Sequence, residues 1–229
     1  MELEKVTKIR DREKRQYDDA CGAALGLQLL GDRWALLIVR ELMYGPKRFG
    51  ELRAGMQGIS ANVLTQRLAE LEERRILQRR QLPPPASTQV YELTEWGYEA
   101  EPIIQHLGKW ATRSPEHDPS LPLSSASMIM SMKTMIDRRR SEKLVARIGF
   151  RFGHESFSGR LAYGSFQAWR GDVENVDATF ITDPRTLAAA IYGGISLAEL
   201  EAAGSLRIEG DRVVAERFVT LFPLPAKFA

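Results

Sequence analysis

The stretch SANVLTQRLAELEERR, residues 60–75, decides how the first half of the chain folds. Leu64, Leu68 and Leu71 recur at helical spacing, which places them on one face of an amphipathic helix. Ser60 is a good N-cap for that helix, because a serine hydroxyl can accept a hydrogen bond from a free backbone N–H of the first turn. The stretch therefore predicts a helix that buries one leucine face.

The opposite face of this helix has the chemistry that reads DNA bases. Asn62 and Gln66 can each form a bidentate pair with adenine, and the methyl group of Thr65 can contact a thymine methyl. Ala69 is small enough to let the backbone come close to the groove. An ordinary surface helix would have the same periodicity, so the neighbouring elements must decide between the two interpretations.

The neighbouring elements have the order of a winged helix-turn-helix domain. The predicted helices are 20–30, 34–43, 49–54 and 60–75, followed by strands 76–82 and 88–93 and a helix from Thr94 to Thr112. The segment PPPAS between the strands cannot be helical and predicts a stiff turn. A helix of 124–140, several strands and further helices follow, so the whole chain is predicted to be α+β.

Positive charge gathers around the predicted reading helix. Residues 47–80 contain eight basic and four acidic residues, whereas residues 116–229 contain 14 of each and the whole chain has a formal net charge of +2. The residues expected to contact DNA phosphates are Lys47, Arg48, Ser60, Arg67, Arg79 and Arg80.

Residues 21–112 resemble the HxlR-type winged helix-turn-helix regulators. The matching stretches are LLGDRWALLIVREL (29–42), GPKRFGELR (45–53), GISANVLTQRLAELE (58–72) and VYELTEWG (90–97). The resemblance implies a transcriptional regulator, usually a repressor, with residues 60–75 in the major groove and residues 76–93 as the wing. The wing tip PPPAST departs from the family because it lacks charge.

A dimer is expected, because the few base contacts of one helix, worth roughly 1–3 kcal/mol each, cannot select one genomic site. Two reading helices on a pseudo-palindromic operator can. The expected dimer surface comprises residues 17–30 and 95–112, with apolar area from Trp96, Ile103, Ile104, Leu107 and Trp110. The alternative is that these residues pack only within their own domain.

The second half begins after SPEHDPSLPLSS (114–125), whose prolines and serines indicate a linker. The predicted division is 1–113 for DNA binding, 114–124 for the linker and 125–229 for a second domain. Residues 124–223 resemble sterol-carrier-type lipid-binding domains, which implies a cavity for an apolar ligand, and such a small molecule is expected to modulate DNA binding. Its expected lining is Met128, Met132, Phe166, Trp169, Phe180, Leu187, Ile191, Leu200 and Phe218, although the same residues could form a packed core.

The single cysteine, Cys21, excludes an internal disulfide and favours a reducing compartment. It stands at the start of the first predicted helix, where a thiolate is stabilised, and the family resemblance implies a redox-sensing repressor as one alternative, with an inert structural thiol as another. A lipid carrier without DNA affinity is a third. Scattered histidines predict neither a metal site nor catalysis, no cofactor is expected, and without an apolar N-terminal signal or membrane span the expected location is the cytoplasm.

Overall fold

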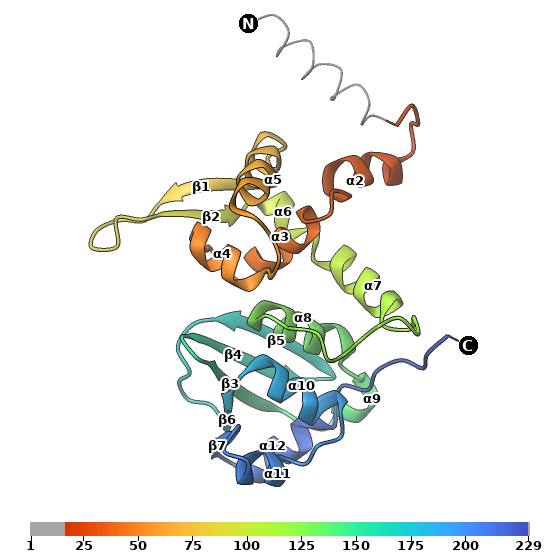
Figure 1. Cartoon of the computed structure of the whole chain (residues 1–229). Coiled ribbons are helices and arrows are strands. Elements are labelled where there is room, and N and C mark those ends of the chain that lie inside the picture. Colours follow the sequence, from red (N-terminus) through yellow and green to blue (C-terminus); the bar gives the residue numbers. More distant parts are fainter. Residues whose placement is uncertain (1–16, 229) are drawn as a thin grey trace, which may run out of the picture.

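The computed structural model describes residues 17–228 of the 229-residue chain and has the mixed α+β composition predicted (Figure 1). Its N-terminal half contains α2 (Gly22–Leu30), α3 (Ala35–Leu42), α4 (Phe49–Gly55), α5 (Ala61–Glu73), β1 (Leu77–Gln81), β2 (Gln89–Leu93), α6 (Glu95–Tyr98) and α7 (Glu101–Ala111). The order is the predicted one, except that the expected last helix is divided into α6 and α7. Residues 1–16 of the predicted first domain lie outside the described residues.

Side-chain caps and one close backbone contact fix the elements around the wing. The Ser60 hydroxyl accepts a hydrogen bond from Val63 N–H and so begins α5. The Thr94 hydroxyl does the same for α6 by accepting from Gly97 N–H. A Cβ at Gly97 would lie 2.1 Å from the carbonyl oxygen of Ile76, so α6 packs directly on the start of the antiparallel β1–β2 hairpin.

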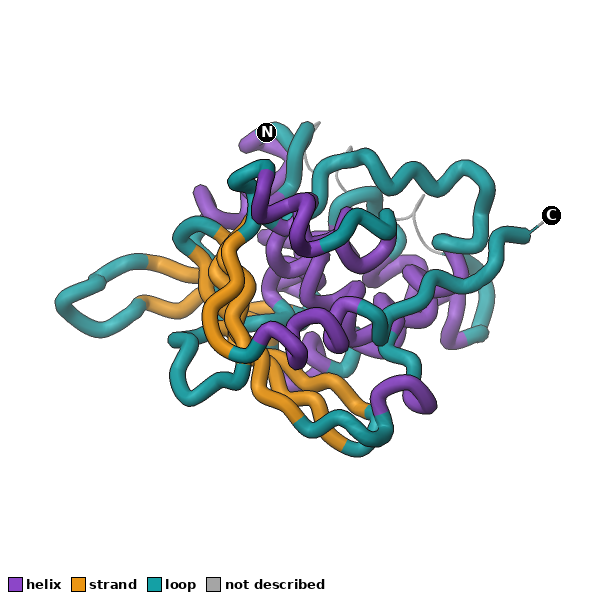
Figure 2. Tube along the Cα trace, turned by 90° about the horizontal axis from the view of Figure 1, so that it is seen from below, coloured by secondary structure: helices purple, strands orange, loops and turns teal. Residues whose placement is uncertain are grey.

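The C-terminal half is a five-stranded sheet with helices. Its elements are α8 (Ser125–Met135), α9 (Arg138–Ser141), β3 (Ala146–Phe152), β4 (Glu155–Ala162), β5 (Ser165–Arg170), β6 (Ala178–Thr182), α10 (Pro184–Tyr192), α11 (Leu197–Ala202), β7 (Arg207–Gly210) and α12 (Arg212–Val219). The strand order is β5-β4-β3-β6-β7, with β3 and β6 parallel and the other pairs antiparallel. Helices α8, α10 and α12 pack on the sheet, and Figure 2 shows helices (purple) lying against the strands (orange).

The two halves share one continuous hydrophobic core. Helix α8 lies between them in Figure 1, where it contacts α3 and α7 above and β5 below. The rings of Tyr44 and Phe157, one from each half, meet edge to face with centroids 5.8 Å apart. The C-terminal tail returns to the end of α7, since Phe228 N–H donates to the Arg113 carbonyl at 2.7 Å.

Between residues 17 and 228, no single helix has the length and apolar character needed to cross a membrane. Helices α2 and α3 meet those criteria only when taken together, and they are bent by 78° relative to each other.

Candidate DNA-binding surface

Helix α5 presents the predicted base-reading side chains to solvent. Its three leucines are no more than 1% exposed, whereas Asn62, Thr65 and Gln66 lie on the other side and are exposed. The amide of Gln66 donates a hydrogen bond to Glu70 Oε1 at 3.0 Å, one turn further along the helix. The side chains that could reach base edges are therefore accessible, and base contact itself stays a prediction.

Two predicted phosphate contacts lie at the starts of helices. Arg48 is exposed immediately before α4, and its backbone N–H donates to Glu51 Oε2 at 2.6 Å. Ser60 is exposed immediately before α5. Both residues are accessible to a phosphate, and a helix start adds a favourable dipole for an anion.

The wing carries two further predicted phosphate contacts, Arg79 and Arg80, on β1. Both side chains are nearly half exposed, and each has an acidic partner: Arg79 pairs with Glu72 at 2.8 Å and Arg80 with Glu92 at 2.8 Å. The Arg79 guanidinium also lies 5.9 Å from the centroid of the Tyr91 ring. These exposed pairs are weak, so a phosphate can compete with the carboxylates.

Arg67 does not fit its predicted role as a phosphate contact. Its guanidinium donates to Asp32, just before α3, and to Glu70 in α5, and its side chain is only 12% exposed. Two carboxylates therefore occupy it, and it fastens the reading helix to the start of α3. A helical wheel shows that Arg67 borders the leucine face but cannot reveal a partner so distant in sequence.

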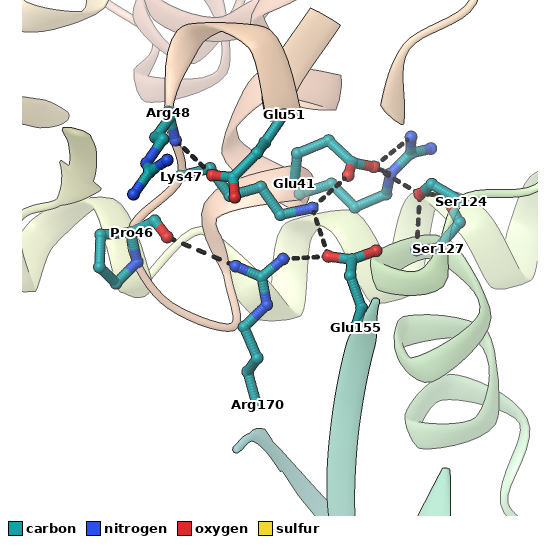
Figure 3. Close-up of polar contacts among 10 residues, drawn as sticks. Glu41, Pro46, Lys47, Arg48, Glu51, Ser124, Ser127, Glu155 and Arg170 are labelled. Carbon is teal, nitrogen blue, oxygen red and sulfur yellow. Dashed lines mark hydrogen bonds and ion pairs between the residues drawn. The ribbon is translucent and has the colours of Figure 1, made fainter. Parts of the chain in front are cut away.

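Lys47 also contradicts its predicted role, because its side chain is 4% exposed and points between the two halves (Figure 3). Its Nζ atom lies 3.0 Å from Glu41 Oε2 and 3.4 Å from Glu155 Oε1. The Lys47 backbone forms a β-bridge with Tyr91 of β2, with N···O distances of 3.0 and 2.8 Å. This bridge turns the side chain inward, whereas the position beside Arg48 alone suggested a solvent-facing cation.

The ion-pair network around Lys47 was missed by the sequence interpretation. Glu41 is fully buried and accepts hydrogen bonds from Arg40 Nη2 at 3.0 Å, Lys47 Nζ at 3.0 Å and Ser124 Oγ at 2.6 Å. The sequence did contain a sign of this network, because the acidic residue Glu41 interrupts the apolar face of α3. A buried carboxylate needs partners, but the sequence does not show that one of them, Ser124, comes from the other half.

Glu155 and Arg170 supply the C-terminal side of this network. One end of the Arg170 guanidinium donates to Glu155, and the other lies 3.5 Å from the Pro46 carbonyl oxygen (Figure 3). Burial raises the pKa of Glu155, but Lys47, a hydrogen bond from Ser125 and Arg170 together outweigh that effect and leave the pKa below its ordinary value. Glu155 is therefore a carboxylate held in its charged form.

The residues predicted to line an apolar ligand pocket mostly belong to the hydrophobic core, and a ligand cavity among them stays a prediction. Eight of them fill the space between the sheet and its helices: Met128, Met132, Phe166, Phe180, Leu187, Ile191, Leu200 and Phe218. The Phe218 ring centroid lies 5.5 Å from that of Phe166 and 5.8 Å from that of Phe180, which is contact distance. Trp169 is instead 48% exposed, and it borders a surface pocket of about 310 Å³ together with Arg147 and Arg160.

Cys21 is exposed immediately before α2, so it is not the buried thiol that the inert alternative assumed. Its backbone N–H donates to Asp19 Oδ1 at 2.8 Å. Among residues 17–228, no three His, Cys, Asp or Glu side chains gather as a metal site requires.

A helix pair with an outward reading helix, followed by a cationic hairpin, defines a winged helix-turn-helix DNA-binding protein. Residues 29–119 match the HxlR-like helix-turn-helix family. The HTH-type transcriptional regulator YodB of Bacillus subtilis is 42% identical over 83 residues, which are 36% of this chain and 74% of YodB. YvaP of the same organism, another HTH-type transcriptional regulator, is 37% identical over 86 residues, covering 38% of this chain and 80% of YvaP.

Solved structures are similar over the same share of the chain. The reduced form of B. subtilis YodB is 37% identical and matches 44% of this chain and 100% of that chain, with a TM-score of 0.39. The redox regulator HypR in its oxidized form is 29% identical, matches 42% and 100% of the two chains, and has a TM-score of 0.39. The chain belongs to the HxlR-like helix-turn-helix family and is a DNA-binding transcriptional regulator.

Proposed function

We propose that this regulator reads a pseudo-palindromic operator as a homodimer and acts as a repressor, with Asn62, Thr65 and Gln66 contacting base edges. The observation that carries the proposal is the outward face of α5, where these side chains are exposed while the leucine face is buried. Arg48 and Ser60 would hold the phosphates on one side of the groove, and Arg79 and Arg80 on the other. Repression, rather than activation, rests on the family resemblance alone.

The dimer proposal is supported by apolar residues on α6 and α7 that the described chain leaves uncovered. Trp96, Ile103, Leu107 and Trp110 are all exposed, and Trp110 reaches 72%. Ile104 is 9% exposed and belongs to the core. Trp96 and Ile103 border a pocket of about 310 Å³ whose other wall is formed by α2, so α2 and α7 together offer a continuous apolar surface to a second copy.

Selection of duplexes from a random-sequence library tests both parts of this proposal. The protein is expected to enrich an inverted repeat whose half-sites lie about 10 base pairs apart, centre to centre, as two-fold symmetric reading helices require. Light scattering is expected to give the mass of a dimer, and Ile103→Glu is expected to give a monomer. Val213→Glu, a control at an exposed apolar residue on α12, should leave the dimer intact. Enrichment of no sequence would contradict the proposal.

We also infer that residues 125–229 form a sterol-carrier-like unit, which follows the 114–124 segment and packs on the first half through the shared core. Support comes from the element order, since strand β6, the Asp183-capped α10, then α11, β7 and α12 follow one another as the resemblance implies. An apolar ligand would have to displace rings such as Phe218 to enter the filled core. Native mass spectrometry tests this: a co-purified lipid would support a ligand-binding role, and an unliganded protein would favour a structural one.

A second candidate function is redox sensing through Cys21, which the exposure of this thiol favours. With one cysteine in the chain, any disulfide that oxidation forms must be an intersubunit or a mixed one. Treatment with a thiol oxidant is expected to release DNA from the unmodified protein but not from Cys21→Ser. Equal release from both proteins would exclude this candidate.

A further inference from the structure

The start of α4 is held on three sides, and the residue that joins them is Lys47. Its backbone pairs with Tyr91 in the wing strand β2, and its side chain reaches Glu41 in α3 and Glu155 in β4. Helix α4 is the first helix of the helix-turn-helix pair, so its placement decides where α5 sits on DNA.

Glu41 supports α4 at both of its ends. Its carboxylate accepts from Lys47 just before α4, and a Cβ at Gly55, the last residue of α4, would lie 2.7 Å from Glu41 Oε2. The same carboxylate accepts from Ser124 at the start of α8. The buried carboxylate therefore connects the reading helices with the C-terminal half.

We propose that Glu155 and Arg170 are positioning residues for DNA binding: they hold the Lys47 side chain and the Pro46 carbonyl, and thereby place α4 and the wing relative to each other. This rests on the proposed function of the reading surface and extends it to residues outside the family match, which ends at residue 119. Neither residue is offered to DNA, because Glu155 is anionic and Arg170 is occupied by Glu155 and Pro46.

Burial explains why this contact can hold a position, whereas a surface ion pair would not. The side chains of Lys47, Glu155 and Arg170 are 4%, 15% and 23% exposed, so solvent screens their attraction only partly. By contrast, the Arg151–Glu209 pair on the same sheet spans 3.3 Å with both side chains nearly half exposed, and the other ion-pair partner of Glu209 is Arg207 of the same sheet. It offers a matched control on the same domain.

The test compares Glu155→Gln with Glu209→Gln in the full-length chain. The probe is a labelled duplex of the sequence that the unmodified protein enriches, and its dissociation constant is measured by fluorescence anisotropy over a series of potassium chloride concentrations. Glu155→Gln is expected to bind roughly tenfold more weakly, within the 5- to 150-fold range of typical coupling between sites. Its base preference and salt dependence are expected to match the unmodified protein, and Glu209→Gln is expected to bind normally.

Amide hydrogen exchange separates positioning from a general loss of structure. Glu155→Gln is expected to raise exchange in the first turn of α4 and in β2 around Tyr91, while the core of the C-terminal sheet stays protected. If Glu155→Gln does not fold, Arg170→Lys is used, since lysine keeps the charge beside Glu155 but cannot hold Pro46 at the same time. Arg170→Lys is expected to weaken DNA binding, but by less than the tenfold loss expected for Glu155→Gln.

Three results would overturn the inference. They are unchanged or tighter binding by a folded Glu155→Gln protein, a salt dependence weakened by about one charge per subunit in Arg170→Gln, which would place Arg170 on a phosphate, and equal losses in Glu209→Gln. If the unmodified protein enriches no DNA sequence, the proposed function fails instead, so the two failures are distinguishable.

Discussion

Lys47 and Glu41 form an ion pair of 3.0 Å in which the lysine side chain is 4% exposed and the glutamate is fully buried. Without Lys47, the buried Glu41 would keep only Arg40 and Ser124 as partners, and breaking a buried ion pair typically costs about 3–5 kcal/mol. The pair also joins the start of α4 to the element that precedes it. The stability of the fold should therefore depend on Lys47 through the buried ion pair, and DNA binding should depend on it through the placement of α4.

Lys47→Met tests the stability route, because methionine fills a similar volume without the charge. We expect the free energy of unfolding to fall by about 3–5 kcal/mol, measured by urea denaturation. Arg48→Met is the matched control at the adjacent exposed cation and should change it by at most about 0.5 kcal/mol. Equal, small changes in both proteins would mean that Lys47 faces solvent after all.

Arg48→Ala tests the contact to phosphate. Loss of one neutralised phosphate in each subunit should lower the slope of log K against log salt by about 0.9 per subunit, or about 1.8 for the dimer. Binding to the selected duplex and to an unrelated duplex should weaken together, because phosphates carry no sequence information. Arg185→Ala, at an exposed arginine on α10, should leave both the slope and the affinity unchanged.

Gln66→Ala tests base reading. We expect affinity for the selected duplex to fall by about 1–3 kcal/mol while affinity for an unrelated duplex stays the same, since a bidentate amide contact discriminates between bases. Competition binding with both duplexes measures the difference. Gln167→Ala, an exposed glutamine on β5, is the control. A uniform loss on both duplexes would assign Gln66 to the backbone instead.

The reading helix was predictable because its evidence is local, whereas the inward-facing cations were not. The leucine spacing and the Ser60 cap fixed both faces of α5, and the structure has the helix at 61–73. Lys47 and Arg67 were misassigned because their partners, Glu155 and Asp32, are distant in sequence. Periodicity shows which side of a helix is apolar, but it does not show which charged group crosses to meet another element.

The apolar residues of the C-terminal half illustrate the same limit. Phe166 and Trp169 were both predicted to line a cavity, but residues three apart on a strand face opposite sides of the sheet, and Trp169 is 48% exposed. Composition also cannot distinguish a lined cavity from a filled core. The decision depends on how Phe218 and Phe222 of the last helix and its following turn fill the space over the sheet, with ring centroids 4.9 Å apart. Packing of this kind is a three-dimensional property.

Tyr44→Phe tests the fit between the two halves. The Tyr44 hydroxyl is buried without a hydrogen-bond partner among the described residues, and burial together with Glu101 raises its pKa. An unpaired buried hydroxyl costs about 1–3 kcal/mol, so phenylalanine should stabilise the protein by roughly 1 kcal/mol. The melting temperature measures this, with Tyr163→Phe, at an 80% exposed tyrosine, as the control. Destabilisation would show that the hydroxyl has a partner.

The pKa of Glu155 gives the network a predictable response to acid. Burial raises this pKa, but Lys47, Ser125 and Arg170 together lower it by more than burial raises it. The Glu155 carboxyl therefore holds its proton less tightly in the folded protein than in the unfolded chain. The contribution to stability is complete above the ordinary value of 4.5 and is lost as the pH falls below it. Urea unfolding across this range should show a shallower pH dependence for Glu155→Gln than for Glu209→Gln. Identical slopes would contradict the assignment.

The β-bridge between Lys47 and Tyr91 lies near the base of the β1–β2 hairpin. A small rotation at this bridge therefore moves the tip of the wing by a larger distance. About six residues separate Tyr91 from the tip, or roughly 20 Å at about 3.3 Å per residue, so a tilt of about 10° at the base would move the tip by roughly 3 Å. That displacement is as large as a hydrogen bond is long. A small rotation where the two halves meet would therefore be enough to make or break contacts between the tip of the wing and DNA.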